Sequence, residues 1–157
     1  MTEDYISVDI EGPQESPVLE TSAIREIGAC SVWNTEDRFF VDLTKVAPDL
    51  AIARFSIWLE KFRKPIMVCF NTWDWLHINY YFWKYLKGCP FGVPGRVIDI
   101  KIYYMGMMNK EYRETNKRDI VKLFPSIQKH THNGLDDAVE QAQIFRGMLE
   151  FNDKFKP

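Results

Sequence analysis

Two acidic side chains stand two residues apart in the segment from Tyr5 to Glu11. Apolar and polar residues alternate along this segment, which is typical of a β-strand with one face towards the core. Asp9 and Glu11 therefore point to the same side, where their negative charges crowd each other. A bound cation relieves such crowding, although an exposed strand face is the commoner explanation for a single acidic pair. The break at Gly12-Pro13 places the pair at the end of the strand.

Three further residues that handle protons or metals follow in the sequence. Asp74 comes after a short apolar run and before a helical pattern, a position where open α/β sheets bind ligands. His132 precedes Asp137 by five residues, at the start of the last helical pattern. Each acid alone also has a structural explanation. Asp74 could simply be the cap of a helix, and Asp137 suits the positive end of a helix dipole.

Taken in order, these residues resemble the DEDD superfamily of 3'-5' exonucleases, in the variant whose last motif carries histidine (DEDDh). The resemblance runs from Ile6 to about Phe145. It departs from the usual pattern at Gly12, where the family commonly has a threonine that helps to hold the 3'-terminal nucleotide. The matching motifs are Asp9-Ile10-Glu11 with Glu26 to Ala29 beside it, Phe70 to Asp74, and His132 to Ala138.

The resemblance implies a phosphodiester hydrolase that uses two divalent metal ions, Mg²⁺ or Mn²⁺, and four carboxylate ligands suit such hard ions. It implies that Asp9 bridges the two ions and that Asp74 supports the second. Glu11 and Asp137 would complete the site of the attacking water. His132 would take the proton of that water as a general base.

Residues beside the motifs are candidates for holding the substrate strand. Trp73 offers an aromatic platform for a base, and Arg118 stands among basic residues that could follow the phosphates. An ordinary solvated helix face explains these basic residues about as well. His130 does not fit the spacing to Asp137, so we expect it at the surface, where it could contact a phosphate. The substrate-binding candidates are Gly12, Asn71, Trp73 and Arg118, and the other basic residues are Arg113, Lys117 and Lys122.

Composition limits the class of protein. The chain has 157 residues, 46% of them hydrophobic, so we expect one exonuclease domain over residues 1–157 with a real core. A net charge of −2 does not fit a protein that coats nucleic acid, but it allows a nucleic-acid substrate. Three cysteines without a C-x-x-C motif predict reduced thiols, no cysteine metal site and a cytoplasmic location. The lack of a long apolar run or signal-peptide pattern predicts no membrane partner.

The intervening segments must position these residues. Short loops between the first three strand patterns predict an antiparallel meander, and the wholly apolar run at 66–70 predicts a central parallel strand. We therefore expect an α/β fold with a mixed five-stranded sheet, three antiparallel strands and then parallel ones, flanked by helices. The resemblance makes this sheet ribonuclease H-like. Strands are expected at 5–11, 23–33, 38–43, 66–70 and 96–100, and helices at 48–64, 75–86, 101–108, 116–124 and 135–150.

The function favoured by these motifs is a 3'-5' exonuclease acting on the 3' end of single-stranded nucleic acid, with RNA or short oligonucleotides preferred. One alternative is a DNA proofreading or trimming exonuclease, because the motifs do not report on the ribose 2'-hydroxyl. Another is a non-catalytic ribonuclease H-like interaction module, which would be marked by the loss of an acid. A homodimer through the apolar stretch from Tyr103 to Met108 is a further hypothesis.

Overall fold

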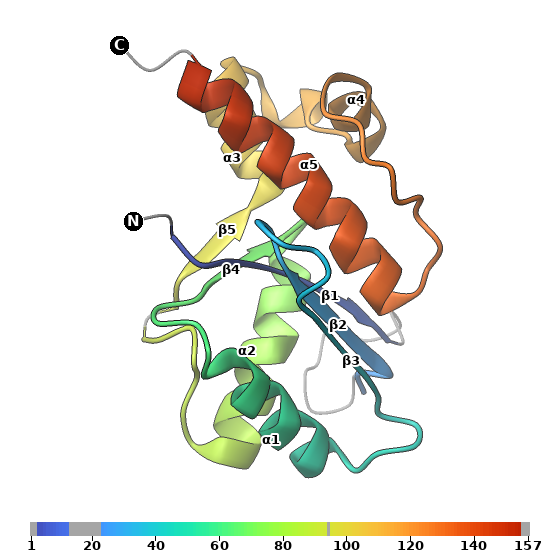
Figure 1. Ribbon diagram of the computed structural model, residues 1–157. Coiled ribbons are helices and arrows are strands. Elements are labelled where there is room, and N and C mark those ends of the chain that lie inside the picture. The colour runs from blue at the N-terminus through green and yellow to red at the C-terminus, as the bar shows by residue number, and fades with distance from the viewer. Residues whose placement is uncertain (1–2, 13–22, 94, 155–157) are drawn as a thin grey trace.

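A computed structural model describes residues 3–12, 23–93 and 95–154 of the chain. Within these residues, five strands form one sheet in the order β3-β2-β1-β4-β5 (Figure 1). β1 pairs antiparallel with β2 and β2 with β3, whereas β4 runs parallel to β1 and β5 parallel to β4. The expected fold class is therefore confirmed. The strands are β1 (Tyr5–Glu11), β2 (Glu26–Ser31), β3 (Arg38–Asp42), β4 (Ile66–Cys69) and β5 (Val97–Asp99).

Helices cover both faces of the sheet (Figure 1). α1 and α2 pack on one face over a core that includes Ile6, Val8 and Phe55, while α5 lies across the other over a core around Phe145. No helix in the described ranges has the length and apolarity needed to cross a membrane. The helices are α1 (Pro48–Leu59), α2 (Thr72–Leu86), α3 (Ile100–Met108), α4 (Lys117–Leu123) and α5 (Gly134–Lys154), with a short 3-10 turn η1 (Tyr112–Glu114).

The alternation in β1 determines which face receives its acids. Ile6 and Val8 are fully buried in the core beneath α1 and α2. Asp9 faces the opposite side, where Gln141 of α5 donates a hydrogen bond to its carboxylate. The strand therefore uses its apolar side chains for packing and directs its acids towards α5.

α1 is shorter than its sequence pattern predicts. The expected helix reached Lys64, with Lys61 in the last turn, but the helix ends at Leu59. The chain then tightens, since the N–H groups of Glu60 and Phe62 each bond to the carbonyl three residues earlier. Lys61 instead pairs with Asp37 and lies 4.4 Å from the centre of the Trp58 ring.

The start of α5 lies directly against the backbone of β2. A Cβ atom added at Gly28 would fall 2.1 Å from the carbonyl carbon and oxygen of Gly134, which is far inside contact distance. Only glycine at position 28 therefore allows the first turn of α5, with Asp137 in it, to sit over β1 and β2. This approach brings the last acid of the set towards the first two.

Replacing Gly28 with alanine should separate α5 from the sheet. Overpacking of this kind costs about 1–3 kcal/mol of stability. Because Asp137 moves with the helix, the exonuclease rate expected from the sequence should fall by more than the loss of folded protein explains. Gly106→Ala is the control, since its Cβ would meet nothing within 4 Å in the middle of α3. That change should stabilise the protein by about 0.5–1 kcal/mol and leave the rate unchanged. Urea denaturation and a nuclease assay measure both effects, and a fully active Gly28→Ala protein would contradict the packing argument.

Candidate active site

The ends of β1 and β4 and the starts of α2 and α5 surround one pocket of about 280 Å³. All five residues of the motif set line it, as do three of the four expected substrate-binding residues. Arg118 is exposed and is not among the pocket residues, whereas its neighbour Lys117 is. The pocket residues expected from the sequence are Asp9, Glu11, Gly12, Asn71, Trp73, Asp74, His132 and Asp137.

Three carboxylates converge at the centre of the pocket. Oxygen atoms of Asp9, Glu11 and Asp137 all lie within 4.8 Å of one another. Burial raises the pKa of Asp9 well above its usual range, and the nearby charges of Asp74, Asp137 and Glu11 raise it further. The cluster therefore holds its negative charges at a cost, which a divalent cation would remove.

Asp74 is not needed as a helix cap. Asn71 caps α2, because its side chain accepts a hydrogen bond of 2.8 Å from the backbone N–H of Trp73. Asp74 is only 5% exposed, and burial raises its pKa to about 8, with Glu11 and Asp99 adding to the shift. The capping explanation for this acid is thus replaced by a buried carboxylate on the pocket wall.

The raised pKa of Asp74 predicts how stability depends on pH when metal is absent. Between its ordinary pKa of 3.8 and the folded value of about 8, the folded protein holds a proton that the unfolded chain has lost. The free energy of unfolding should therefore fall as pH rises across this window. Urea midpoints in EDTA at pH 5 and pH 8 measure the fall, and Asp74→Asn should reduce it. An Asp74→Asn protein with the same pH dependence as the parent would contradict this prediction.

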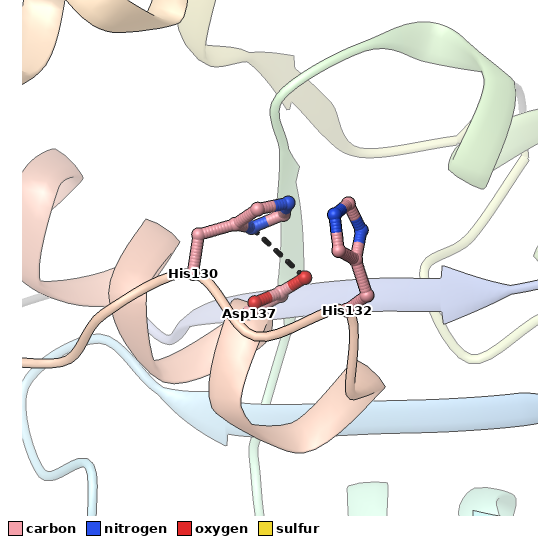
Figure 2. Close-up of side chains that lie close together, drawn as sticks. All are labelled: His130, His132 and Asp137. Carbon is pink, nitrogen blue, oxygen red and sulfur yellow. Dashed lines mark ion pairs between the residues drawn. The ribbon is translucent and has the colours of Figure 1, made fainter.

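Two histidines stand beside Asp137 (Figure 2). Their rings lie 4.4 Å apart and are nearly perpendicular. His132 has a φ of 57°, a left-handed conformation that aims its ring at the pocket while α5 begins two residues later. His130 is exposed, as expected, but it also lines the pocket, with Nδ1 2.9 Å from Oδ2 of Asp137.

The carboxylate of Asp137 is suited to holding a metal ion. Its Oδ1 accepts a hydrogen bond of 2.9 Å from the backbone N–H of Thr131. Its Oδ2 is buried and has no hydrogen-bond partner, although it lies within ion-pair distance of His130. A buried carboxylate oxygen without a donor is costly, and a divalent ion in the pocket would satisfy it. The oxygen-rich set of donors fits a hard divalent cation.

Hydrogen bonds fix the loop that carries the histidines. The carboxylate of Glu26 accepts from the backbone N–H of Gly134 at 3.0 Å and from the amide of Asn133 at 3.4 Å. Asn133 in turn accepts from the backbone N–H groups of Leu135 and Asp136, both at 3.2 Å. Glu26, which begins β2, therefore ties the start of α5 to the sheet.

Several pocket residues were given no role by the sequence motifs. Gln141, one turn after Asp137 on α5, bonds to Asp9, and this helical spacing could have revealed it. His77 is buried in α2, with Nδ1 3.0 Å from the carbonyl oxygen of Trp73. Lys117 of α4 reaches the pocket and pairs with Glu140 of α5, a contact between distant segments that no local pattern signals.

Comparisons with known proteins agree with this arrangement. The 3'-5' DNA exonuclease Cap18 of Escherichia coli is 28% identical to this chain over 181 residues, covering 97% of this chain and 95% of the relative. The crystal structure of the nuclease domain of 3'hExo, a DEDDh family member bound to rAMP, has a TM-score of 0.72 at 16% identity and covers 98% of this chain and 95% of that one. The crystal structure of a full-length 3'-exonuclease has a TM-score of 0.68 at 16% identity and covers 96% of this chain and 84% of that one. No protein-family model matches the chain.

The mixed sheet gathers four carboxylates and a histidine in one pocket, which is an arrangement that suits a metal-dependent nuclease. The chain is similar over nearly its whole length to a 3'-5' exonuclease, and its fold is that of a DEDDh family member. Both findings agree with the expected family and enzyme class. None of the acids is missing, so the alternative of a non-catalytic module loses its support.

Proposed function

We propose that this protein removes nucleotides one at a time from the 3' end of single-stranded DNA. The observation that carries the reaction is the convergence of Asp9, Glu11 and Asp137 beside the buried Asp74 in one open pocket. The preference for DNA is supported by the name of the relative that is 28% identical along nearly the whole chain.

RNA is the second candidate substrate, and it was the substrate preferred in the sequence analysis, although the motifs themselves do not separate RNA from DNA. Support for RNA comes from a structural neighbour, a 3'-exonuclease that recognises the 3' end of the histone mRNA stem-loop, at 14% identity and a TM-score of 0.69. The likeness to it concerns the fold, whereas the DNA-named relative shares twice that identity. We therefore place DNA first.

We propose that Asp9, Glu11, Asp74 and Asp137 hold two divalent ions, Mg²⁺ or Mn²⁺. Such ions supply charge neutralisation at the phosphate and activation of the attacking water. The unpartnered Oδ2 of Asp137 supports this assignment, and so does the mutual repulsion that raises the pKa of Asp9.

The chain's own side chains would orient the reactants around this centre. His132, on the loop beside Asp137, accepts the proton of the attacking water, which a neutral imidazole can do. Trp73 lines the pocket with its ring 4.5 Å from that of His77, so it is braced to stack on a base. Gly12 and Asn71 line the same opening and border the terminal nucleotide.

The proposed function is tested with matched DNA and RNA oligonucleotides, labelled at the 5' end, with Mg²⁺ or Mn²⁺. A ladder shortening from the 3' end is expected, faster on DNA than on RNA and faster on a single strand than on a blunt duplex. EDTA should stop the reaction. Activity that persists in EDTA, or label released first as a mononucleotide, would overturn the mechanism; faster cleavage of RNA would reverse only the sugar preference.

Four further proposals accompany this function. We propose that residues 1–157 form a single exonuclease domain, that the protein works in the cytoplasm with reduced cysteines, and that it forms a homodimer through residues 103–108. Half-buried Tyr103, Met107 and Met108 pack against the core beside α5, and Ile102, the residue just before this stretch, is 47% exposed. Arg118, exposed outside the pocket, is proposed to contact substrate upstream of the 3' end.

A further inference from the structure

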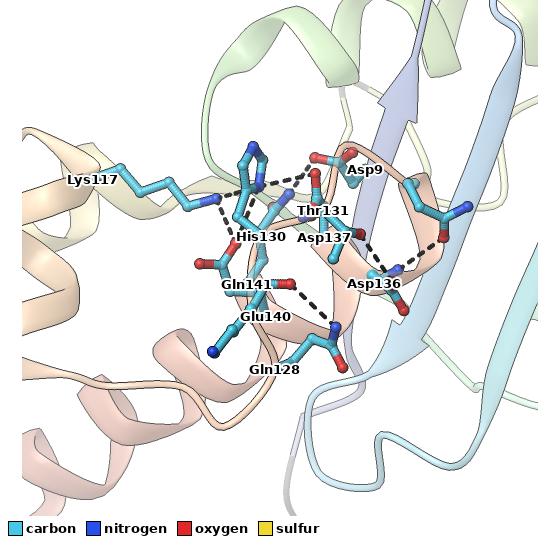
Figure 3. A network of polar contacts seen from close by, with 12 residues as sticks. Asp9, Lys117, Gln128, His130, Thr131, Asp136, Asp137, Glu140 and Gln141 are labelled. Carbon is cyan, nitrogen blue, oxygen red and sulfur yellow. Dashed lines mark hydrogen bonds and ion pairs between the residues drawn. The ribbon is translucent and has the colours of Figure 1, made fainter.

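A lysine enters the acidic pocket from a segment that contains none of the family motifs. Lys117 begins α4, and its ammonium group reaches α5, where Nζ lies 2.6 Å from a carboxylate oxygen of Glu140 (Figure 3). The Glu140 side chain is 7% exposed and that of Lys117 30% exposed. Removing both charges partly from water costs free energy, so this pair is not explained as an ordinary surface ion pair.

The ammonium group of Lys117 lies near the residues that would surround the phosphate of a bound strand. Nζ of Lys117 lies 3.1 Å from Nδ1 of His130, the same nitrogen that approaches Asp137. It also lies 5.2 Å from the centre of the Phe70 ring at the end of β4. Its positive charge opposes the rise in the pKa of Asp9, which places it within electrostatic reach of the carboxylate cluster.

An ammonium group has three N–H donors. The contacts with Glu140 and His130 use two of them, so a third can face the pocket that Lys117 lines. Glu140 fixes the direction of the side chain, and a lysine fixed in this way loses little further entropy when it binds an anion. A lysine that served only to join α4 to α5 would have no need to line the pocket as well.

We propose that Lys117, positioned by Glu140, binds a non-bridging oxygen of the phosphate that is cut, the phosphate that leaves as the 5'-phosphate of the released nucleotide. This inference rests on the proposed function and places a protein cation beside the cluster of carboxylates. The ligand class is a nucleoside 5'-monophosphate, either as product or as the last unit of the strand.

The test compares the binding of deoxyadenosine 5'-monophosphate with that of deoxyadenosine, by calorimetry in Mg²⁺. Lys117→Met should weaken binding of the monophosphate roughly 10-fold, the usual worth of a hydrogen bond to a charged group. Binding of deoxyadenosine should stay within about 2-fold, because the nucleoside lacks the phosphate that Lys117 contacts. Lys117→Arg should restore much of the difference between the two ligands.

Two paired variants control the experiment. Lys117→Met leaves Glu140 buried without its partner, so the double variant K117M/E140Q removes both charges and should show the same loss of phosphate preference. K110M/E114Q removes another lysine–glutamate pair, 3.2 Å apart and well exposed, and should behave as the parent.

The outcomes separate this inference from the proposed function. If the parent degrades DNA but Lys117→Met and K117M/E140Q both keep the parent's preference for the monophosphate, the role of Lys117 alone is overturned. Equal loss of both ligands in the variants also overturns it, since that result marks a structural role. A parent that neither degrades nucleic acid nor binds the monophosphate overturns the proposed function as well.

Discussion

Replacing Asp9 with asparagine should lower the exonuclease rate by roughly 10²–10³-fold or more, because Asp9 is proposed to hold the metal ions that would stabilise charge at the reacting phosphate. Asp9 is the acid on which the others converge: its pKa is raised by burial and by the charges of Asp74, Asp137 and Glu11. Asparagine has nearly the same shape and can still accept the hydrogen bond from Gln141. The loss should therefore concern charge rather than fold.

The same substitution should stabilise the metal-free protein. Removing one of several crowded negative charges relieves repulsion in the folded state, so the melting temperature in EDTA should rise. The gain in melting temperature on adding Mn²⁺ should shrink, because a ligand that binds only the folded state stabilises it in proportion to its affinity. Glu36→Gln, at a side chain that is 81% exposed, should change neither quantity. An Asp9→Asn protein that gains as much from Mn²⁺ as the parent would show that Asp9 is not a principal ligand.

The fold follows from patterns that are local in the sequence. Alternation in residues 5–11 predicts both the strand and the side on which Asp9 lies, because a strand has only two faces. The apolar run at 66–70 predicts a strand covered on both sides, and β4 indeed lies between β1 and β5. These features need no knowledge of distant contacts, so the sequence is sufficient for them.

The features that sequence reasoning missed depend on packing between distant segments. Lys117 and Arg118 are adjacent, yet one turns into the pocket and the other into solvent, since neighbours on a helix point about 100° apart. Which of them faces inward is decided by how α4 lies against α5. The end of α1 at Leu59 is likewise set by turns that residue propensity does not encode.

The candidate site also has residues that the sequence predicts and residues that it misses. The resemblance to DEDDh exonucleases predicts that His132 and Asp137 belong to one site, and the structure places both at the pocket. Spacing also sets His130 aside, yet His130 is the histidine whose Nδ1 lies 2.9 Å from Asp137. The backbone turns at the positive φ of His132, and ring nitrogens of both histidines lie within 4.8 Å of a carboxylate oxygen of Asp137.

This arrangement makes the two histidines separable by experiment. His130 contacts Asp137 and Glu140 at 2.9 and 3.3 Å, so His130→Ala should loosen Asp137, which we propose as a metal ligand, and reduce the stabilisation by Mn²⁺. A ring nitrogen of His132 also lies within 4.8 Å of a carboxylate oxygen of Asp137, but we propose His132 as the base and not as a ligand, so His132→Ala should leave that stabilisation intact. The two variants thus differ in metal binding before any rate is measured.

His132→Ala should lower the maximal rate by roughly 10²–10⁴-fold while leaving substrate affinity nearly unchanged, as expected for the loss of a general base. An imidazole accepts a proton only in its neutral form, so the rate of the parent should rise with pH and this rise should vanish in the variant. Single-turnover rates from pH 5.5 to 8.5 at saturating Mn²⁺ measure both effects. A variant that keeps the pH-dependent rise would exclude His132 as the base, and one that loses stabilisation by Mn²⁺ would show that His132 is a metal ligand instead.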